Sequence, residues 1–270
     1  MSQPVALTIA GSDSGAGAGI QADLKTFAAL DVYGLSVITA VTAQNTVGVR
    51  AVQEIDAGIV AAQLDAVADD FPVNAVKTGM LSSAAIIEVV AAGLRRHGLS
   101  TLVVDPVMVA KSGDRLLRED AVEALVTRLL PLATVVTPNL PEAEVLSKVL
   151  IKSFADRLAA ARGILDLGAR AVVVKGGHGG DDPVIDLLVT ADGVTEFRAQ
   201  RVNSTSTHGT GCTFSAAIAA GMASGLGLEA AVAGAREYVS TALAQAQALG
   251  HGHGPLGHFA RKEATDGVRR

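Results

Sequence analysis

The chain has 270 residues, of which 49% are hydrophobic, 3% are aromatic and 18% are charged. Its formal net charge of -5 argues against nucleic acid or an anionic membrane as the partner, and the few aromatic residues leave little surface for base stacking. The single cysteine, Cys212, excludes an internal disulfide and favours a cytoplasmic location. Nothing at the N-terminus resembles the basic region of a secretory signal.

Short β-branched runs alternate along the chain with longer helical patterns, which predicts right-handed βαβ units and a mostly parallel sheet. The expected strands are residues 5–10, 35–42, 75–78, 101–107, 134–137 and 171–175, and the expected helices are residues 19–30, 57–70, 83–96, 119–130, 141–146 and 154–167. Residues 184–190 and 194–199 predict a hairpin, and the last helices are expected to begin at Thr213 and Leu228. We expect one domain over residues 1–258 and a disordered tail over 259–270.

A glycine-rich segment, residues 11–19, follows the first expected strand. Its spacing is not that of a Walker loop, and it is a poor match to a dinucleotide-binding fingerprint. The glycines would permit close approach of the backbone to a flat ligand, although a flexible turn would have the same composition. Asp23 follows in the next helix, where it could either stabilise the helix dipole or accept hydrogen bonds from a ligand amine.

Polar side chains follow several of the later strands, at the edge where open α/β sheets bind ligands. Asp105 ends one strand, and Asn139 and Glu142 open a helix after the next. Asp105 and Glu142 could form a magnesium–phosphate platform, or they could be a turn residue and a helix N-terminal acid. Lys175 could pair with nucleotide phosphates or simply extend to water. Their coincidence at successive strand ends favours a site.

The segment from Thr207 to Ser215 combines two glycines with the only cysteine and leads into an alanine-rich helical pattern. The unpaired N–H groups of a helix start around Thr210 and Gly211 would form an anion hole. The same helix start would stabilise Cys212 as a thiolate, and phosphoryl transfer needs both anion donors and a group that accepts a proton. The alternative is a small buried cysteine at a glycine-rich helix start.

The order of these motifs resembles the hydroxymethylpyrimidine/phosphomethylpyrimidine kinases of thiamine biosynthesis, which have the ribokinase-like fold. The resemblance covers nearly the whole chain, and it departs at residues 203–206, a segment that is usually more charged. It implies a single-domain, three-layer α/β fold with a mostly parallel central sheet flanked by helices. The matching segments are residues 10–25, 42–45, 77–81, 105–108, 138–142 and 208–213.

The resemblance also implies roles for individual residues. Gly11, Asp23, Gln44, Met80 and Val107 would surround an aminopyrimidine, with Asp23 and Gln44 as its polar contacts. Asp105 and Glu142 would lie near Mg²⁺, Asn139 and Lys175 near the phosphates of ATP, and Thr210, Gly211 and Cys212 would form the anion hole. Cys212 occupies the place where sugar kinases of this fold carry an aspartate base. The implied reaction transfers the γ-phosphoryl group of ATP to the 5-hydroxymethyl group and then to the resulting monophosphate, and the implied assembly is a homodimer.

Three alternatives stay open at this stage. A pyridoxal or pyridoxine kinase would share the fold and, in some members, the Gly-Thr-Gly-Cys motif, but Gln44 favours the pyrimidine. A nicotinamide-dependent oxidoreductase is disfavoured by the glycine spacing and the metal-type acids. A catalytically silent binding module is disfavoured by the presence of Asp105, Glu142, Lys175 and Cys212 together.

Overall fold

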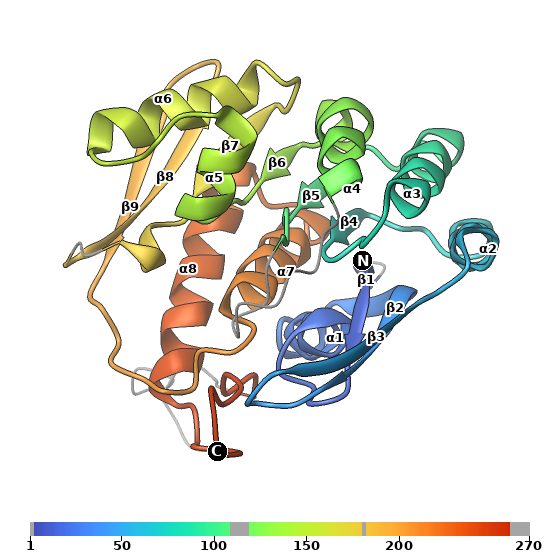
Figure 1. Cartoon of the computed structure of the whole chain (residues 1–270), viewed down its shortest axis with the longest axis horizontal. Coiled ribbons are helices and arrows are strands. Elements are labelled where there is room, and N and C mark those ends of the chain that lie inside the picture. The colour runs from blue at the N-terminus through green and yellow to red at the C-terminus, as the bar shows by residue number, and fades with distance from the viewer. Residues whose placement is uncertain (1–2, 109–118, 180–181, 260–270) are drawn as a thin grey trace.

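The computed structural model describes residues 3–108, 119–179 and 182–259, and their strands form one sheet in the order β3-β2-β1-β4-β5-β6-β7-β8-β9 (Figure 1). The strands from β2 to β7 in this order run parallel, whereas β3, β8 and β9 pair antiparallel. This confirms the predicted mostly parallel sheet. The strands are β1 (Val5–Asp13), β2 (Tyr33–Gln44), β3 (Val49–Glu54), β4 (Ala75–Thr78), β5 (Leu102–Val104), β6 (Val135–Val136), β7 (Ala171–Val174), β8 (Val184–Thr190) and β9 (Val194–Ala199).

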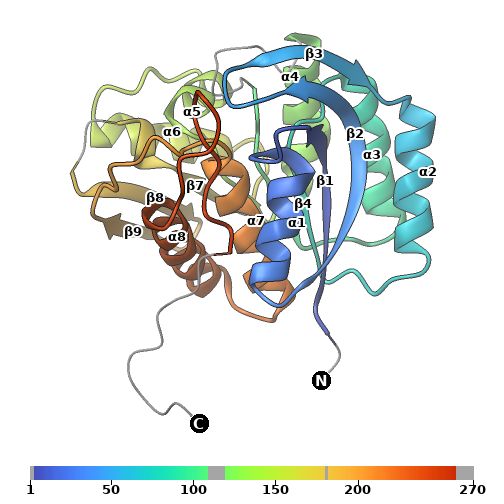
Figure 2. The same cartoon turned by 90° about the horizontal axis from the view of Figure 1, so that it is seen from below.

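Helices cover both faces of the sheet, which confirms the three-layer arrangement (Figure 2). Helices α1 (Gly19–Ala29), α7 (Thr210–Ala223) and α8 (Leu228–Ala244) pack on one face. The other face carries α2 (Ala57–Ala68), α3 (Ala84–Arg96), α4 (Glu119–Ala124), α5 (Leu140–Ser147) and α6 (Phe154–Leu165). None of the helices in the described part of the chain has both the length and the apolar character that crossing a bilayer requires.

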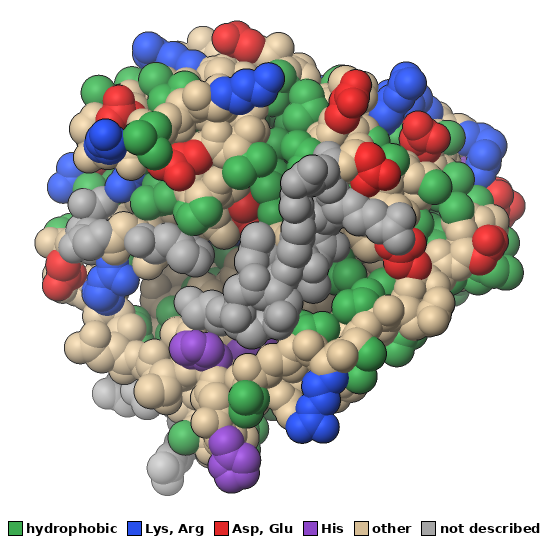
Figure 3. All heavy atoms as spheres, viewed as in Figure 1, with side chains coloured by type: hydrophobic (Ala, Val, Ile, Leu, Met, Phe, Trp, Pro, Cys, Tyr) green, Lys and Arg blue, Asp and Glu red, His purple; other side chains and the backbone are tan. Residues whose placement is uncertain are grey.

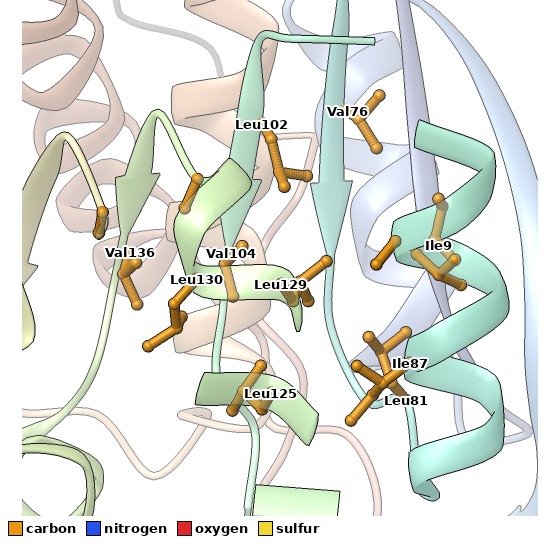
Figure 4. Close-up of a cluster of buried hydrophobic side chains, with 14 of the residues drawn as sticks. Ile9, Val76, Leu81, Ile87, Leu102, Val104, Leu125, Leu129, Leu130 and Val136 are labelled. Carbon is orange, nitrogen blue, oxygen red and sulfur yellow. The ribbon is translucent and has the colours of Figure 1, made fainter. Parts of the chain in front are cut away.

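The central strands are apolar on both faces because helices cover both sides of the sheet. In β5, Leu102 and Val104 belong to the core beneath α2 to α6, whereas Val103 belongs to the core beneath α1, α7 and α8. Figure 4 shows Leu102 and Val104 gathered with Val136 and Leu129 in the first of these cores. The two cores make a rigid frame that fixes where the parallel strands end.

Strand β3 was not predicted. It is the edge strand beside β2, and its residues are mostly exposed, so Val49 to Glu54 lack the apolar alternation that marks a half-buried strand. Strands β1 and β2 also extend further than predicted, to Asp13 and Gln44. The helix predicted over 119–130 is divided: α4 ends at Ala124, a π-helical turn spans Leu125–Leu129, and a 3₁₀ turn with Pro131 in its first turn spans Leu130–Leu132.

Helix α7 begins at Thr210, three residues before the predicted start. Its N-cap, Gly209, has a φ of 82°, and a Cβ atom there would lie 1.8 Å from the carbonyl oxygen of Gly17. Only glycine fits such a position, because the backbone is left-handed and the contact is closed to a side chain. Through this contact the glycine-rich segment, residues 11–19, packs against the start of α7. With the helix beginning at Thr210, Gly211 and Cys212 lie in its first turn.

The C-terminal segment 250–258 packs on the domain. The backbone N–H of His253 donates to the carbonyl of Thr46, that of His208 to Gly254, and that of Gly257 to Ala242, over 2.9 to 3.0 Å. His258 is buried, with its Nε2 atom 3.0 Å from the Thr213 hydroxyl. The segment thus connects the β2–β3 turn, the loop before α7 and the end of α8. The predicted disorder over 259–270 concerns residues that, Phe259 apart, lie outside the described part of the chain.

Burial lowers the pKa of His258 to about 4, which makes stability dependent on pH. His258 binds a proton near pH 6.5 in the unfolded chain but only near pH 4 in the folded protein. The contribution of this residue to the free energy of unfolding is therefore fully present above pH 6.5 and is lost as the pH falls toward 4. We expect about 2 kcal/mol of stability to be lost between pH 7.5 and pH 5 through this residue. Urea unfolding at both pH values should show a smaller loss in His258→Asn than in the wild type. A variant of the exposed His251, His251→Asn, should keep the wild-type difference.

Candidate active site

A cavity of about 670 Å³ opens at the carboxyl ends of the parallel strands, within the size range of sites for small molecules. On the face viewed in Figure 3, most Lys and Arg side chains lie near the edge of the molecule, and several Asp and Glu side chains lie further in. Most of the residues predicted for the site line this one cavity. They are Gly11, Gln44, Met80, Asp105, Val107, Asn139, Glu142, Lys175, Thr210, Gly211 and Cys212.

Asp105 and Lys175 form an ion pair in the centre of this cavity. The Lys175 Nζ atom lies 2.9 Å from Asp105 Oδ1, and the buried Asp105 carboxylate also accepts hydrogen bonds from the hydroxyls of Thr137 and Ser215. Burial opposes the charged ammonium, but the neighbouring carboxylates of Asp105 and Glu142 raise the pKa of Lys175. The pair connects the ends of β5 and β7 with the first turns of α7. Lys175 therefore remains a cation next to the start of that helix.

A Cβ atom at Gly211 would lie 3.2 Å from Lys175 Nζ and 3.7 Å from an Asp105 oxygen. The missing side chain leaves the backbone of the first turn of α7 open to this ion pair. N–H groups in a first helical turn have no partner within the helix and carry the positive end of its dipole. The arrangement is therefore suited to an anion.

Asn139 and Glu142 cap helix α5. The Asn139 side chain accepts a hydrogen bond from the Glu142 N–H over 2.9 Å, and the Glu142 carboxylate accepts one from the Asn139 N–H over 2.9 Å. This reciprocal pair is a capping box, which accounts for the amide and acid in terms of helix stability. Burial, together with the charge of Asp105, raises the pKa of Glu142 to about 7.

The carboxylates of Asp105 and Glu142 face the same cavity, so we tested whether the site suits a magnesium ion. Mg²⁺ in kinases is usually held by one or two carboxylates together with waters and substrate phosphates. In the described residues, no group of three or more His, Cys, Asp or Glu side chains is arranged to hold a metal ion by itself. Two buried carboxylates that repel one another fit a divalent cation that arrives with a nucleotide.

Cys212 lies in the first turn of α7, half-buried on the cavity wall. The prediction that the helix start holds it as a thiolate is contradicted, because burial raises the pKa of the thiol to about 11. The positive charge of Lys77 and a backbone hydrogen bond from Gly19 act in the opposite direction but do not outweigh burial. At neutral pH the resting protein therefore carries a neutral thiol at this position.

Asp23 is the one predicted site residue that the cavity wall does not include. Its side chain is fully buried behind the wall, where both carboxylate oxygens lie within 3.0 Å of Lys77 Nζ and one accepts a hydrogen bond from Thr8. The structure thus places Asp23 in a buried ion pair, although the resemblance implies a polar contact with the ring.

Two further residues of the cavity wall, Asp13 and His208, were not predicted. Asp13 is buried, accepts hydrogen bonds from the N–H groups of residues 15, 17 and 18, and lies 2.8 Å from His208 Nε2. The amide of Gln44 lies between the Thr42 hydroxyl, at 3.2 Å, and His208 Nε2, at 3.4 Å. Asp13 and His208 both lie within segments that the sequence analysis singled out. Their pairing across 195 residues could not be predicted from those segments.

Comparison with known proteins gives the family of the chain. The family model described as phosphomethylpyrimidine kinase matches residues 13–257. The chain belongs to this family. It is 54% identical to the hydroxymethylpyrimidine/phosphomethylpyrimidine kinase of Rhizobium meliloti, over 95% of this chain and 97% of the relative. It is 48% identical to the protein of the same name from Bacillus subtilis, over 95% of each chain.

Solved structures include members of this family and also pyridoxal kinases. The phosphomethylpyrimidine kinase of Clostridium difficile 630 is 43% identical, with a TM-score of 0.79 over 88% of this chain and 98% of that one. The pyridoxal kinase of Staphylococcus aureus, solved in complex with AMP-PCP, is 36% identical, with a TM-score of 0.90 over 97% of this chain and 96% of that one. The fold is thus ribokinase-like, as predicted, and both vitamin kinases share it.

Proposed function

We propose that the protein is an ATP-dependent kinase of thiamine biosynthesis that phosphorylates 4-amino-5-hydroxymethyl-2-methylpyrimidine to the monophosphate and then to the diphosphate. The observation that carries this proposal is the Asp105–Lys175 pair beside Gly211 at the start of α7, in a cavity that also contains Gln44. These features provide a place for a transferred phosphoryl group and a polar contact for a pyrimidine. Pyridoxal kinase activity is the second candidate, favoured by the structural likeness to the Staphylococcus aureus enzyme.

In the first transfer, the bond between the γ-phosphorus and ADP breaks and a bond to the hydroxymethyl oxygen forms. The N–H groups around Gly211 and the Lys175 ammonium would bind the oxygens of the moving group, where negative charge must be stabilised. Cys212 would take the proton that leaves the hydroxyl, and the loose transition state of phosphoryl transfer demands little basicity from this acceptor. Cys212 must be a thiolate at that moment, so cations near the thiol matter for the rate.

Mg²⁺ is proposed as the metal, with Asp105 and Glu142 holding it partly through water, and Asn139 and Lys175 near the phosphates. When bound, the metal neutralises charge on the transferring phosphates. The buried positions of the two carboxylates support this assignment, since burial and the nearby charge of Asp105 raise the pKa of Glu142, and a bound cation would offset both effects. Gly11, Gln44, Met80 and Val107 are proposed to bind the pyrimidine ring.

A cytoplasmic location and a homodimer are further parts of the proposal. The absence of a possible internal disulfide supports a reducing compartment, and the resemblance to the kinase family supports the dimer. Light scattering on the purified full chain would test the dimer, since the expected mass is twice the monomer mass of 27.3 kDa.

Assay of ADP release with Mg-ATP and hydroxymethylpyrimidine, beside a parallel reaction with pyridoxine, tests the proposed activity. We expect rapid turnover of the pyrimidine, with monophosphate and then diphosphate identified by mass. Turnover of pyridoxine alone would establish the second candidate, and no ADP release with either acceptor would contradict both. Release of ADP that stops at the monophosphate would contradict the second transfer.

Gln44→Met should lower kcat/KM for hydroxymethylpyrimidine while leaving pyridoxine unchanged or improved. The Gln44 amide can donate and accept, so it can pair with a ring nitrogen and an exocyclic amine, which the pyrimidine offers and pyridoxine does not. Leaving such groups unpaired costs about 1 to 3 kcal/mol, or roughly 5- to 150-fold in discrimination. Steady-state kinetics with both acceptors on the same preparation measure this ratio.

A structural role for Gln44 would produce a different result. Its amide lies near Thr42 and His208, so loss of these contacts alone should lower activity with both acceptors and lower Tm. Gln63→Met is the matched control, since the Gln63 amide joins α2 to the backbone of Ile38 outside the cavity. An equal loss for the two acceptors in Gln44→Met would contradict the specificity role.

A further inference from the structure

The ion pair between Lys77 of β4 and Asp23 of α1 lies inside the fold, with both side chains fully buried. Lys77 Nζ is 2.8 and 3.0 Å from the two carboxylate oxygens, and the Thr8 hydroxyl donates to the same carboxylate over 2.6 Å. Taking both charges out of water costs several kcal/mol each, and well-packed apolar residues often stabilise a core as well or better. Fold stability alone therefore gives a weak account of this pair.

The two partners stand in different positions relative to the cavity. Lys77 forms part of the cavity wall, whereas Asp23 lies behind it. A Cβ atom at Gly79 would lie only 2.9 Å from Lys77 Nζ and 3.1 Å from Ala10 Cβ, so the backbone after β4 passes directly over the ammonium. Asp23 pairs with the Lys77 ammonium from the side away from the cavity. Lys77, the positive member of the pair, is therefore nearer to the cavity than Asp23 is.

Cys212 lines the same cavity as Lys77, and several charged groups lie near it. They are Lys77 from β4, Asp23 from α1, Asp105 after β5 and Lys175 after β7, together with the backbone N–H of Gly19. Helix α7, which carries Cys212, packs on β4 and β5 as well as on α1. Lys77 is the foremost of the groups that lower the pKa of the Cys212 thiol, which burial holds high, whereas Asp23 and Asp105 raise it.

We propose that Lys77, held in place by Asp23, is a positioning residue that acts through Cys212, its fixed positive charge favouring the thiolate that accepts the proton of the acceptor hydroxyl. The role of Asp23 is then to fix the place of the ammonium. This inference rests on the proposed function of Cys212. It predicts opposite electrostatic effects when the two partners of one ion pair are removed separately.

Alkylation of the thiol with iodoacetamide tests the inference without turnover, because Cys212 is the only cysteine in the chain. The rate is followed against pH on the purified full-length protein, and the midpoint reports the pH at which the thiolate forms. Lys77→Met should move the midpoint up by about one pH unit or more, which is about tenfold less thiolate at a given pH. Asp23→Asn should move it down, since the cation then acts without its counter-charge.

A purely structural role of the pair would move both midpoints in the same direction, because either change breaks the same contacts. That result would overturn the proposal, as would an unchanged midpoint in Lys77→Met. If Lys77→Met does not fold, the double variant Lys77→Met/Asp23→Asn removes both charges and should show a smaller upward shift, because Lys77 has the larger of the two opposite effects on the thiol. Arg96→Met, which removes the exposed ion pair with Asp65, is the matched control and should leave the midpoint unchanged.

Activity measurements separate failure of this inference from failure of the proposed function. If Cys212→Ala is inactive but the two midpoints move together, Cys212 keeps its role and Lys77 loses the one proposed here. If the midpoints move in opposite directions, kcat of Lys77→Met should fall by about tenfold or more at neutral pH, with a smaller change in KM for ATP.

Discussion

Cys212→Ala should lower kcat for hydroxymethylpyrimidine by about 10² or more while leaving ATP binding largely intact, since a positioned general base typically contributes at least that much. The thiol lies in the first turn of α7 next to Gly211, where the phosphoryl group is proposed to be transferred. Single-turnover kinetics with Mg-ATP would measure the chemical step, and nucleotide titration would measure binding.

Cys212→Ser provides the matched control for packing, because it keeps nearly the volume of the thiol. We expect it also to be impaired, since a serine hydroxyl is a much weaker acid than a thiol and yields its anion less readily. Near-normal turnover in both variants would mean that Cys212 is a small residue at a glycine-rich helix start and nothing more. In that case the proton of the acceptor must leave by another route.

Asp105→Asn should lower kcat/KM for Mg-ATP by about 10- to 150-fold, the range that corresponds to loss of a hydrogen bond to a charged group. The carboxylate is proposed to hold the metal with Glu142, and it is also the partner of Lys175 at 2.9 Å. Removing one member of a buried ion pair costs about 3 to 5 kcal/mol, so Tm should fall as well. Nucleotide kinetics at several magnesium concentrations and thermal unfolding would measure the two effects.

Affinity for the pyrimidine alone should be nearly unchanged in Asp105→Asn, because Gln44 and Met80 on the acceptor side are intact. Isothermal titration calorimetry without nucleotide measures this affinity. A large loss would instead place Asp105 in the acceptor site. Asp65→Asn is the matched control: Asp65 pairs with His97 and Arg96 near the surface, so neither activity nor pyrimidine binding should change.

The regular parts of the fold were predictable because their physical basis is local in the sequence. Ala75–Thr78, Val184–Thr190 and Val194–Ala199 have the predicted bounds, since apolar β-branched runs between turn residues can be recognised without knowledge of the fold. Edge strand β3 could not be recognised in this way because most of its side chains are exposed and leave no apolar pattern in the sequence. The start of α7 was displaced because it depends on the contact between Gly209 and Gly17, which are far apart in the sequence.

The composition of the candidate site was likewise predictable from motifs, whereas the pairing of its charges was not. The sequence by itself determined the family, the class of fold and most of the predicted residues of the cavity wall. Strand ends and glycine-rich turns can be recognised from a few consecutive residues. Only the tertiary structure decided that Asp23 pairs with Lys77, that Lys175 pairs with Asp105 and that Cys212 rests as a neutral thiol. Ionisation depends on burial and on neighbouring charges, and these come from distant parts of the chain: the partners of the two ion pairs are 54 and 70 residues apart.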